Sequence, residues 1–323
     1  MAKKKKLRLR YEAKKFLSYF IFFLILAIYA LSEGSKIYKH YQYQKTDEYK
    51  LINNEYSKKQ TSYILKNTNK KIIEFLIENP HDKNYYLILT EKYYLEKNFN
   101  KYIEYYQKYP SLEINRIIAR VNVGSNESWY NNPKETDISQ NNLMLVNKYH
   151  YLKEDFSRTD LKNISLQYSY NGNIASEETI LQFEKMYKDV KNELGINLMV
   201  NSSYRSYQEQ DEIYREFKIK GEEYADSYAA RPGYSEHQTG LAIDITSTAH
   251  PTSKAFTDSE EYKWLKENSY KYGFILRYPE GKEDITGYNT ESWHFRYVGV
   301  KDATKIYNED ITFDEYYAYY IEK

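Results

Sequence analysis

The sequence predicts a mixed α+β domain with a small antiparallel sheet and flanking helices, preceded by an N-terminal transmembrane helix and an α-helical stalk. Three observations lead to this prediction. Residues 16–31 form an uncharged, strongly apolar run, and residues 33–113 are polar with few glycines or prolines. From Ile114 onward, strand and helix signals alternate between glycines and prolines. We therefore expect a basic tail at 1–15, a membrane segment at 16–32, a helical stalk or small helical module at 33–113, and the mixed domain at 114–323.

The N-terminal segment is expected to anchor the chain in the cell membrane. Residues 1–15 carry a dense cluster of lysines and arginines, and the apolar run after them is at the short end of what crosses a bilayer as a helix. The positive-inside rule places the basic tail in the cytoplasm and the remaining chain outside the cell. A cleaved signal peptide is the alternative, because Ala30-Leu31-Ser32 offers a small-x-small site. Either way, the body of the protein is exported.

Composition excludes several kinds of protein. The 47 basic and 46 acidic residues nearly cancel, so no overall positive field points to nucleic acid as a partner. The chain has no cysteine, which excludes disulfides, thiolate metal ligands, a thiol nucleophile and anchoring through a lipidated cysteine. No serine is followed three residues later by lysine, which excludes serine peptidases with a Ser-x-x-Lys nucleophile. The zinc-protease helix motif His-Glu-x-x-His is also absent, so any zinc site must draw its ligands from separate motifs.

The stalk region is predicted to contain short amphipathic helices on either side of the Asn79-Pro80 break. Its apolar positions cluster at residues 72–76 and 85–95, without a convincing fixed-period repeat. The segment serves either as a spacer or as a module that binds a partner. Its residues do not identify that partner.

The elements of the mixed domain follow from their caps and periodicity. Ser176 opens a helix that Gly195 closes, and a strand is expected at 196–202. Ser206 and Glu209 form a capping box for a helix that runs to about residue 220, which places Arg205 at a strand-to-helix turn. A second capping box, at Thr257 and Glu260, is expected to start a helix that ends near residue 273 and leads into a strand at 274–278.

Two histidine motifs supply the ligands of a catalytic zinc site. In the strand predicted at 241–246, Asp244 alternates away from the apolar face, and His237 lies on the glycine-containing loop before it. In the strand at 293–298, His294 lies on the face opposite to the aromatic side chains. Two imidazoles and one carboxylate are the donor set of a catalytic zinc ion that keeps one position open. The other four histidines are predicted to be surface residues: His40, His81, His150 and His250.

Two further residues complete a hydrolytic set. Glu291 precedes His294 by three residues, where a loop enters the strand, so it can lie near the metal without binding it. We expect Glu291 to take the proton of an activated water and pass it to the leaving amine. Arg205 is expected to stabilise the oxyanion, because a guanidinium is always charged and presents several donors.

These motifs resemble the VanY-type D-alanyl-D-alanine carboxypeptidases, zinc enzymes that trim peptidoglycan stem peptides. The resemblance rests on residues 203–206, 235–244 and 291–296 and covers the chain from about Ile114 to its end. It implies that His237, Asp244 and His294 bind zinc, that Glu291 is the base and that Arg205 stabilises the substrate carbonyl. It also implies that Ser235 and Gln210 contact the terminal D-alanine. The expected partner is therefore a peptidoglycan stem peptide outside the membrane.

Two other functions remain open from the sequence. One is an endopeptidase or L,D-carboxypeptidase of the same zinc family, because the ligands define the reaction whereas the cleft walls define which bond enters. The other is a non-catalytic, membrane-tethered scaffold that binds the cell wall. An intact Glu291 argues against the scaffold.

Overall fold

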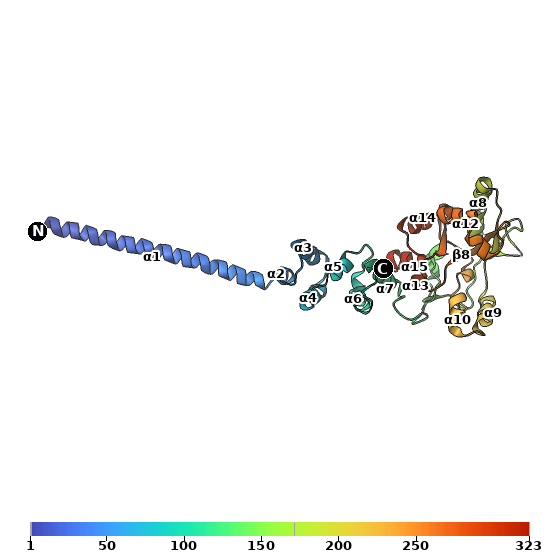
Figure 1. The fold of residues 1–323 in the computed structure, drawn as a ribbon, viewed down its shortest axis with the longest axis horizontal. Helices are drawn as coiled ribbons and strands as arrows, with labels where there is room; N and C mark the ends of the chain where they lie inside the picture. The colour runs from blue at the N-terminus through green and yellow to red at the C-terminus, as the bar shows by residue number, and fades with distance from the viewer. Residues whose placement is uncertain (1, 171, 323) are drawn as a thin grey trace. The chain divides into compact units, whose positions relative to one another are not determined.

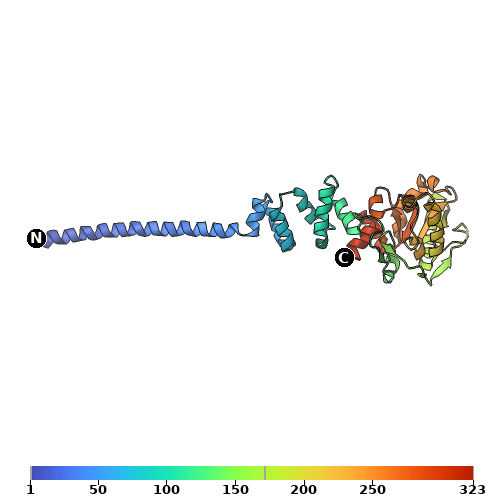
Figure 2. The ribbon, with the colours of Figure 1, turned by 90° about the horizontal axis from the view of Figure 1, so that it is seen from below.

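A computed structural model of the chain describes residues 2–170 and 172–322. Met1 and Lys323, the outer ends of the predicted segments 1–15 and 114–323, lie outside the described residues. The chain divides into two compact units, one reaching to Thr90 and one beginning at Glu91. Each unit is described separately below (Figures 1 and 2).

The first unit begins with one long helix, α1 (Ala2–Gln44), which both views show as an uninterrupted rod (Figures 1 and 2). Its apolar side chains are exposed, with Phe16 and Leu31 each about three-quarters accessible. Among the helices of the described residues, α1 alone has the length and composition to cross a membrane. At 1.5 Å per residue, the 36 residues of Leu9–Gln44 span roughly 54 Å, well beyond the ~30 Å hydrocarbon layer.

Four short helices complete the first unit: α2 (Asp47–Asn53), α3 (Lys58–Asn67), α4 (Lys70–Glu78) and α5 (Lys83–Thr90). Ser57 and Gln60 form a capping box that starts α3, and Asn69 caps α4. The predicted break at Asn79-Pro80 separates α4 from α5. Buried Leu51, Ile64, Leu76 and Ile88 give these helices a small apolar core.

The second unit opens with helices and short strand pairs. A 3-10 turn η1 (Glu96–Asn98) leads into α6 (Phe99–Lys108) and α7 (Ile114–Val123). Strand β1 (Lys134–Glu135) pairs in parallel with β2 (His150–Tyr151), with the 3-10 segment η2 (Ile138–Leu143) between them. Strands β3 (Leu161–Asn163) and β4 (Ile174–Ser176) form an antiparallel pair.

The central sheet of this unit has four antiparallel strands in the order β5-β6-β8-β7. They are β5 (Leu198–Ser202), β6 (Ala242–Ser247), β7 (Phe274–Tyr278) and β8 (Glu291–Tyr297). The register pairs Asp244 of β6 with His294 of β8, and Ala242 with Arg296. The predicted mixed fold with a small antiparallel sheet is therefore confirmed.

Helices surround the sheet. They are α8 (Glu177–Leu194), α9 (Tyr207–Lys218), α10 (Glu222–Tyr228), α11 (Ser253–Thr257), α12 (Glu260–Asn268), α13 (Glu283–Thr286), α14 (Val300–Glu309) and α15 (Phe313–Tyr320). The predicted caps of α8 and α9 are present: Ser176 and left-handed Gly195 bound α8, and Ser206 with Glu209 forms a capping box.

The predicted capping box at Thr257 is wrong. Thr257 is the last residue of α11, and Ser259 accepts the backbone N–H of Tyr262 at the start of α12. Helix α12 ends at Asn268, and the 3-10 turn η4 (Ser269–Tyr272) continues to left-handed Gly273. Two candidate hydroxyls stand close together in the sequence, and the chain uses the second one.

The two faces of the sheet differ in chemistry. Ile243 and Ile245 of β6 and Phe295 of β8 join Phe183 and Val190 of α8 in one apolar core. The opposite face carries a row of polar residues: Asp244, His294, Arg296 and Arg277. All but Asp244 are buried, and this polar face positions the candidate site.

Candidate active site

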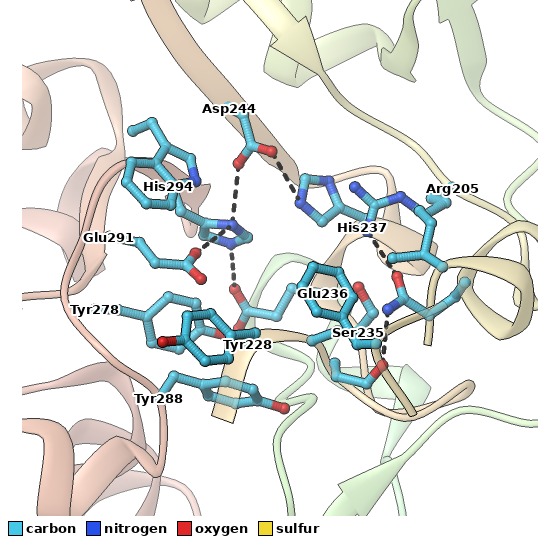
Figure 3. Close-up of a pocket in the computed structure, with 16 residues that line it drawn as sticks. Arg205, Tyr228, Ser235, Glu236, His237, Asp244, Tyr278, Tyr288, Glu291 and His294 are labelled. Atoms are coloured by element: carbon cyan, nitrogen blue, oxygen red, sulfur yellow. Dashed lines mark hydrogen bonds and ion pairs between the residues drawn. The ribbon is translucent and has the colours of Figure 1, made fainter. Parts of the chain in front are cut away.

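The register of β6 and β8 brings the predicted metal ligands together. Asp244 and His294 are directly paired neighbours on the polar face of the sheet. His237 lies in the 3-10 turn η3 (Glu236–Thr239), which ends at Gly240 in a left-handed conformation with φ 67°. This turn folds the chain back into β6, so the imidazole of His237 faces the carboxylate of Asp244 (Figure 3).

The donor atoms have the spacing of metal ligands. His237 Nε2 is 3.5 Å from Asp244 Oδ2, and His294 Nδ1 is 3.2 Å from Asp244 Oδ1. One ligand atom from each of the three residues lies within 4.8 Å of the others. Ligands about 2.0–2.1 Å from a tetrahedral zinc ion lie about 3.3–3.4 Å from one another. Asp244 Oδ1 is also buried without a hydrogen-bond partner, so the three residues fit a zinc ion.

The electrostatics of the three residues favour a cation. Burial lowers the pKa of His237 to about 3, which keeps its imidazole neutral as a ligand must be. Burial opposes the charge on Asp244, but the facing His237 and His294 lower its pKa to about 2. For His294, burial is outweighed by Asp244 and Glu236, which raise its pKa to about 9. The carboxylates thus hold a positive charge at this point, which is a proton when no metal is bound.

Glu291 is the first residue of β8 and lies beside the ligands without joining them. Its Oε2 is 3.6 Å from His294 Nδ1. Burial raises the pKa of Glu291 to about 7, with the nearby Asp244 adding to the shift and His294 opposing it. A carboxyl group with a pKa near neutrality can both accept and release a proton.

Arg205 lies on the turn between β5 and α9, as predicted, and lines the cavity in front of the ligands. Its guanidinium donates from Nη1 to Gln210 Oε1 over 2.7 Å and from Nη2 to Ser202 Oγ over 3.0 Å. Gln210 is held in turn, since its Nε2 donates to the carbonyl oxygen of Ala230 over 2.7 Å. These two acceptors hold the guanidinium where it lines the cavity.

The cavity has a volume of about 200 Å³ and is lined by all seven predicted site residues. Ser235 is one of the lining residues and directly precedes η3. Tyr228, Tyr278 and Tyr288 form an aromatic wall on the side of Glu291 and His294 (Figure 3). The Tyr278 ring lies 5.0 Å from the His294 ring, between centroids.

Several residues of the site were not identified from the sequence. The chain has 40 tyrosines, so nothing in the sequence distinguishes the three tyrosines of the wall from the others. Glu236 is part of the histidine motif, yet its contact with His294 depends on tertiary structure. The prediction that His150 lies on the surface is wrong, because this histidine is buried, with its Nδ1 3.1 Å from Asn147 Oδ1.

Comparison with known proteins adds an independent line of evidence. The profile of the VanY D-alanyl-D-alanine carboxypeptidase family matches residues 173–300, which include all seven predicted site residues. The chain is 42% identical over 185 residues to YodJ of Bacillus subtilis, covering 55% of this chain and 67% of that protein. It is 35% identical over 185 residues to the bifunctional D-Ala-D-Ala dipeptidase and carboxypeptidase VanXYC of Enterococcus gallinarum, covering 55% of this chain and 95% of that protein.

A D-alanyl-D-alanine carboxypeptidase of Enterococcus faecium is 34% identical over 197 residues, covering 58% of this chain but only 61% of that enzyme. Among solved structures, the LdcB LD-carboxypeptidase is similar with a TM-score of 0.55 and 39% identity, over 58% of this chain and 90% of that one. The residues that the family profile matches hold the four-stranded sheet and its polar face. The chain therefore belongs to the VanY family of D-alanyl-D-alanine carboxypeptidases, which are zinc metallopeptidases.

Proposed function

We propose that this protein hydrolyses the peptide bond before the C-terminal D-alanine of peptidoglycan stem peptides, with zinc held by His237, Asp244 and His294. One observation carries the proposal. The three candidate ligands, a carboxyl group with a pKa near 7 and a fixed guanidinium all line one cavity. These groups correspond to the parts that hydrolysis of an amide by an activated water requires.

The ligand residues and Glu291 have separate tasks. When bound, zinc supplies a Lewis acid that polarises a carbonyl group and lowers the pKa of water. Glu291 lies 3.6 Å from His294 Nδ1, close enough to the ligands to take a proton from water beside them. Its raised pKa lets it then give that proton to the leaving amine, so the same carboxyl group acts first as a base and then as an acid.

Arg205 would stabilise the negative charge that develops on the carbonyl oxygen. A guanidinium has five N–H groups, and the contacts with Gln210 and Ser202 occupy two of them. The remaining N–H groups are free of these anchors and are available to the substrate. In this account, Gln210 orients Arg205, and Ser235, which also lines the cavity, contributes to the binding of the terminal D-alanine.

The size of the cavity supports a small terminal residue. Its volume of about 200 Å³ lies below the roughly 300–1,000 Å³ of pockets that bind drug-sized ligands. We propose pentapeptide stems, which end in D-Ala-D-Ala, as the first substrate. A tetrapeptide stem, cleaved as an L,D-carboxypeptidase cleaves it, is the second candidate, and the similarity to the LdcB LD-carboxypeptidase favours it.

We further propose that the enzyme acts outside the cell membrane. Segment 1–15 would form a cytoplasmic tail, 16–32 the membrane span and 33–113 the stalk, with the catalytic domain at 114–323 in the wall space. The exposed apolar surface of α1 and the substrate class support this topology. N-terminal sequencing of the protein from membrane and culture-medium fractions tests it, since a chain that begins at Glu33, after the Ala30-Leu31-Ser32 site, would mean that the segment is cleaved as a signal peptide.

Mass spectrometry of muropeptides tests the reaction. Purified full-length protein in detergent, loaded with zinc, is incubated separately with pentapeptide and tetrapeptide muropeptides. Loss of one D-alanine from the pentapeptide supports the first candidate, and loss of one from the tetrapeptide supports the second. Cleavage within the stem or between stems would show an endopeptidase, and no product from any muropeptide would favour the scaffold.

A further inference from the structure

Beneath the candidate zinc site, Glu236 is a completely buried carboxylate whose two oxygens face different partners. Its Oε1 accepts a hydrogen bond from Arg277 Nε over 2.8 Å and lies 3.1 Å from Arg296 Nη1. Its Oε2 lies 3.5 Å from Nε2 of His294. Oε2 and Nε2 are both buried, and the described residues give neither atom a hydrogen-bond partner, so their only polar contact is this ion pair. Each atom is therefore the counterpart that the other needs.

Two buried arginines fix the orientation of Glu236. Arg277 and Arg296 come from β7 and β8 and have no exposed side-chain surface. The guanidinium of Arg277 also binds both oxygens of Asp314 at the start of α15, over 2.5 and 3.1 Å. Two buried carboxylates thus balance two buried guanidinium groups, and the Glu236 oxygen that faces the arginines must be an acceptor.

The two ring nitrogens of His294 face different carboxylates. Nδ1 points to Asp244 and Glu291, whereas Nε2 points to Glu236 (Figure 3). A neutral imidazole carries its proton on only one of its two nitrogens. The proton stays on the nitrogen that has a hydrogen-bond acceptor beside it. A carboxylate at Nε2 accepts the proton there and leaves the lone pair on Nδ1.

We infer that Glu236 is a positioning residue that holds the Nε2–H of His294 and thereby presents Nδ1 to the metal. The inference rests on the proposed ligand set. It extends that set by a buried ion cluster that links η3, β7, β8 and α15 to one ligand. Outer carboxylates that hold a ligating histidine contribute about tenfold to a hundredfold to metal affinity.

The variant Glu236→Gln gives the sharpest test, because the arginines determine how its amide is turned. Arg277 and Arg296 can only donate, so the amide oxygen faces them and the amide nitrogen faces His294. That nitrogen donates to Nε2 and moves the ring proton to Nδ1. We expect zinc affinity, measured by competition with a chelator, to fall about tenfold to a hundredfold. We also expect ¹⁵N NMR of the metal-free Glu236→Gln variant, recorded at a pH high enough for the His294 ring to be neutral, to show the ring proton on Nδ1.

Two further variants distinguish the positioning of His294 from a general loss of stability in the buried ion cluster. Glu236→Asp keeps the charge that balances the arginines but shortens the reach towards His294, so zinc affinity falls while the fold is retained. Asp314→Asn removes a carboxylate from the same cluster without touching His294. It is the matched control, expected to lower thermal stability while zinc affinity stays within about threefold of wild type, well inside the effect of an outer carboxylate.

The outcomes are distinguishable from a failure of the proposed function. If the wild-type protein binds no zinc, the ligand set is wrong. If the wild type binds zinc and both Glu236 variants bind it equally well, only the role of Glu236 is wrong. An Asp314→Asn protein that loses as much affinity as Glu236→Asp would also overturn the inference, and so would an unchanged His294 tautomer in Glu236→Gln. If Glu236→Gln does not fold, the Glu236→Asp measurement decides.

Discussion

Replacing Arg205 with lysine tests the account of catalysis most finely. The guanidinium has five N–H donors, and Gln210 and Ser202 take two, which leaves three for the substrate. A lysine ammonium has three donors, so keeping both anchors leaves one. Loss of one donor to a developing oxyanion costs about 10²–10³ in rate, or about 2.7–4 kcal/mol. We therefore expect Arg205→Lys to lower kcat/KM by at least that factor.

The assay is steady-state release of D-alanine from a pentapeptide by the zinc-loaded protein, with zinc content measured in parallel. Zinc content should not change, because Arg205 is not among the candidate ligands. Ser202→Ala is the control, since it removes one anchor and leaves the guanidinium itself in place; its loss should be much smaller. Wild-type kcat/KM in Arg205→Lys would refute the assigned role, and loss of zinc would show that Arg205 supports the metal site instead.

Three further predictions concern other parts of the molecule. Glu291→Gln should lower kcat by about 10²–10⁴ with zinc retained, and retention of full activity would exclude Glu291 as the base. Gly273→Ala should lower the melting temperature more than Gly281→Ala, because both have φ near 80° but only at Gly273 would the new Cβ meet backbone, at 2.9 Å; equal losses would contradict this. Burial lowers the pKa of Lys148 to about 8, against about 10.4 in unfolded chains. The charged side chain therefore destabilises the fold below pH 8, and this destabilisation disappears as the pH rises from about 8 to about 10.4. Denaturant unfolding of wild type and Lys148→Met should therefore differ by about 3 kcal/mol more at pH 7 than at pH 11, and a constant difference would contradict the burial argument.

Local chemistry accounts for the parts of the fold that were predictable. A serine cap and a closing glycine predicted the bounds of the helix at 177–194, because both residues act on neighbouring backbone groups. The box at Ser206 and Glu209 was readable for the same reason. At Thr257 the same rule failed, since Ser259 two residues later offers an equivalent hydroxyl and only packing decides between them.

The candidate ligands were predictable from local patterns. One motif contains both His237 and Asp244, and the alternation of side chains along β6 and β8 places Asp244 and His294 on the polar face. The groups that support the ligands were not predictable in this way. Arg277 and Arg296 alternate with apolar residues in their strands, which is typical of a solvent-facing side. They are fully buried because Glu236 and Asp314 neutralise them from elements 41 and 37 residues away from Arg277. Pairing across such distances in sequence leaves no local pattern.

Zinc titration with a simultaneous record of D-alanine release tests the central claim most directly. Metal-free protein is titrated with zinc in the presence of pentapeptide muropeptide, and Asp244→Asn serves as the ligand variant. The account predicts that D-alanine release rises in proportion to zinc and saturates at one zinc per chain, and that Asp244→Asn requires far more metal. Full release in the metal-free protein, or saturation by Asp244→Asn at the same zinc concentration as wild type, would contradict it.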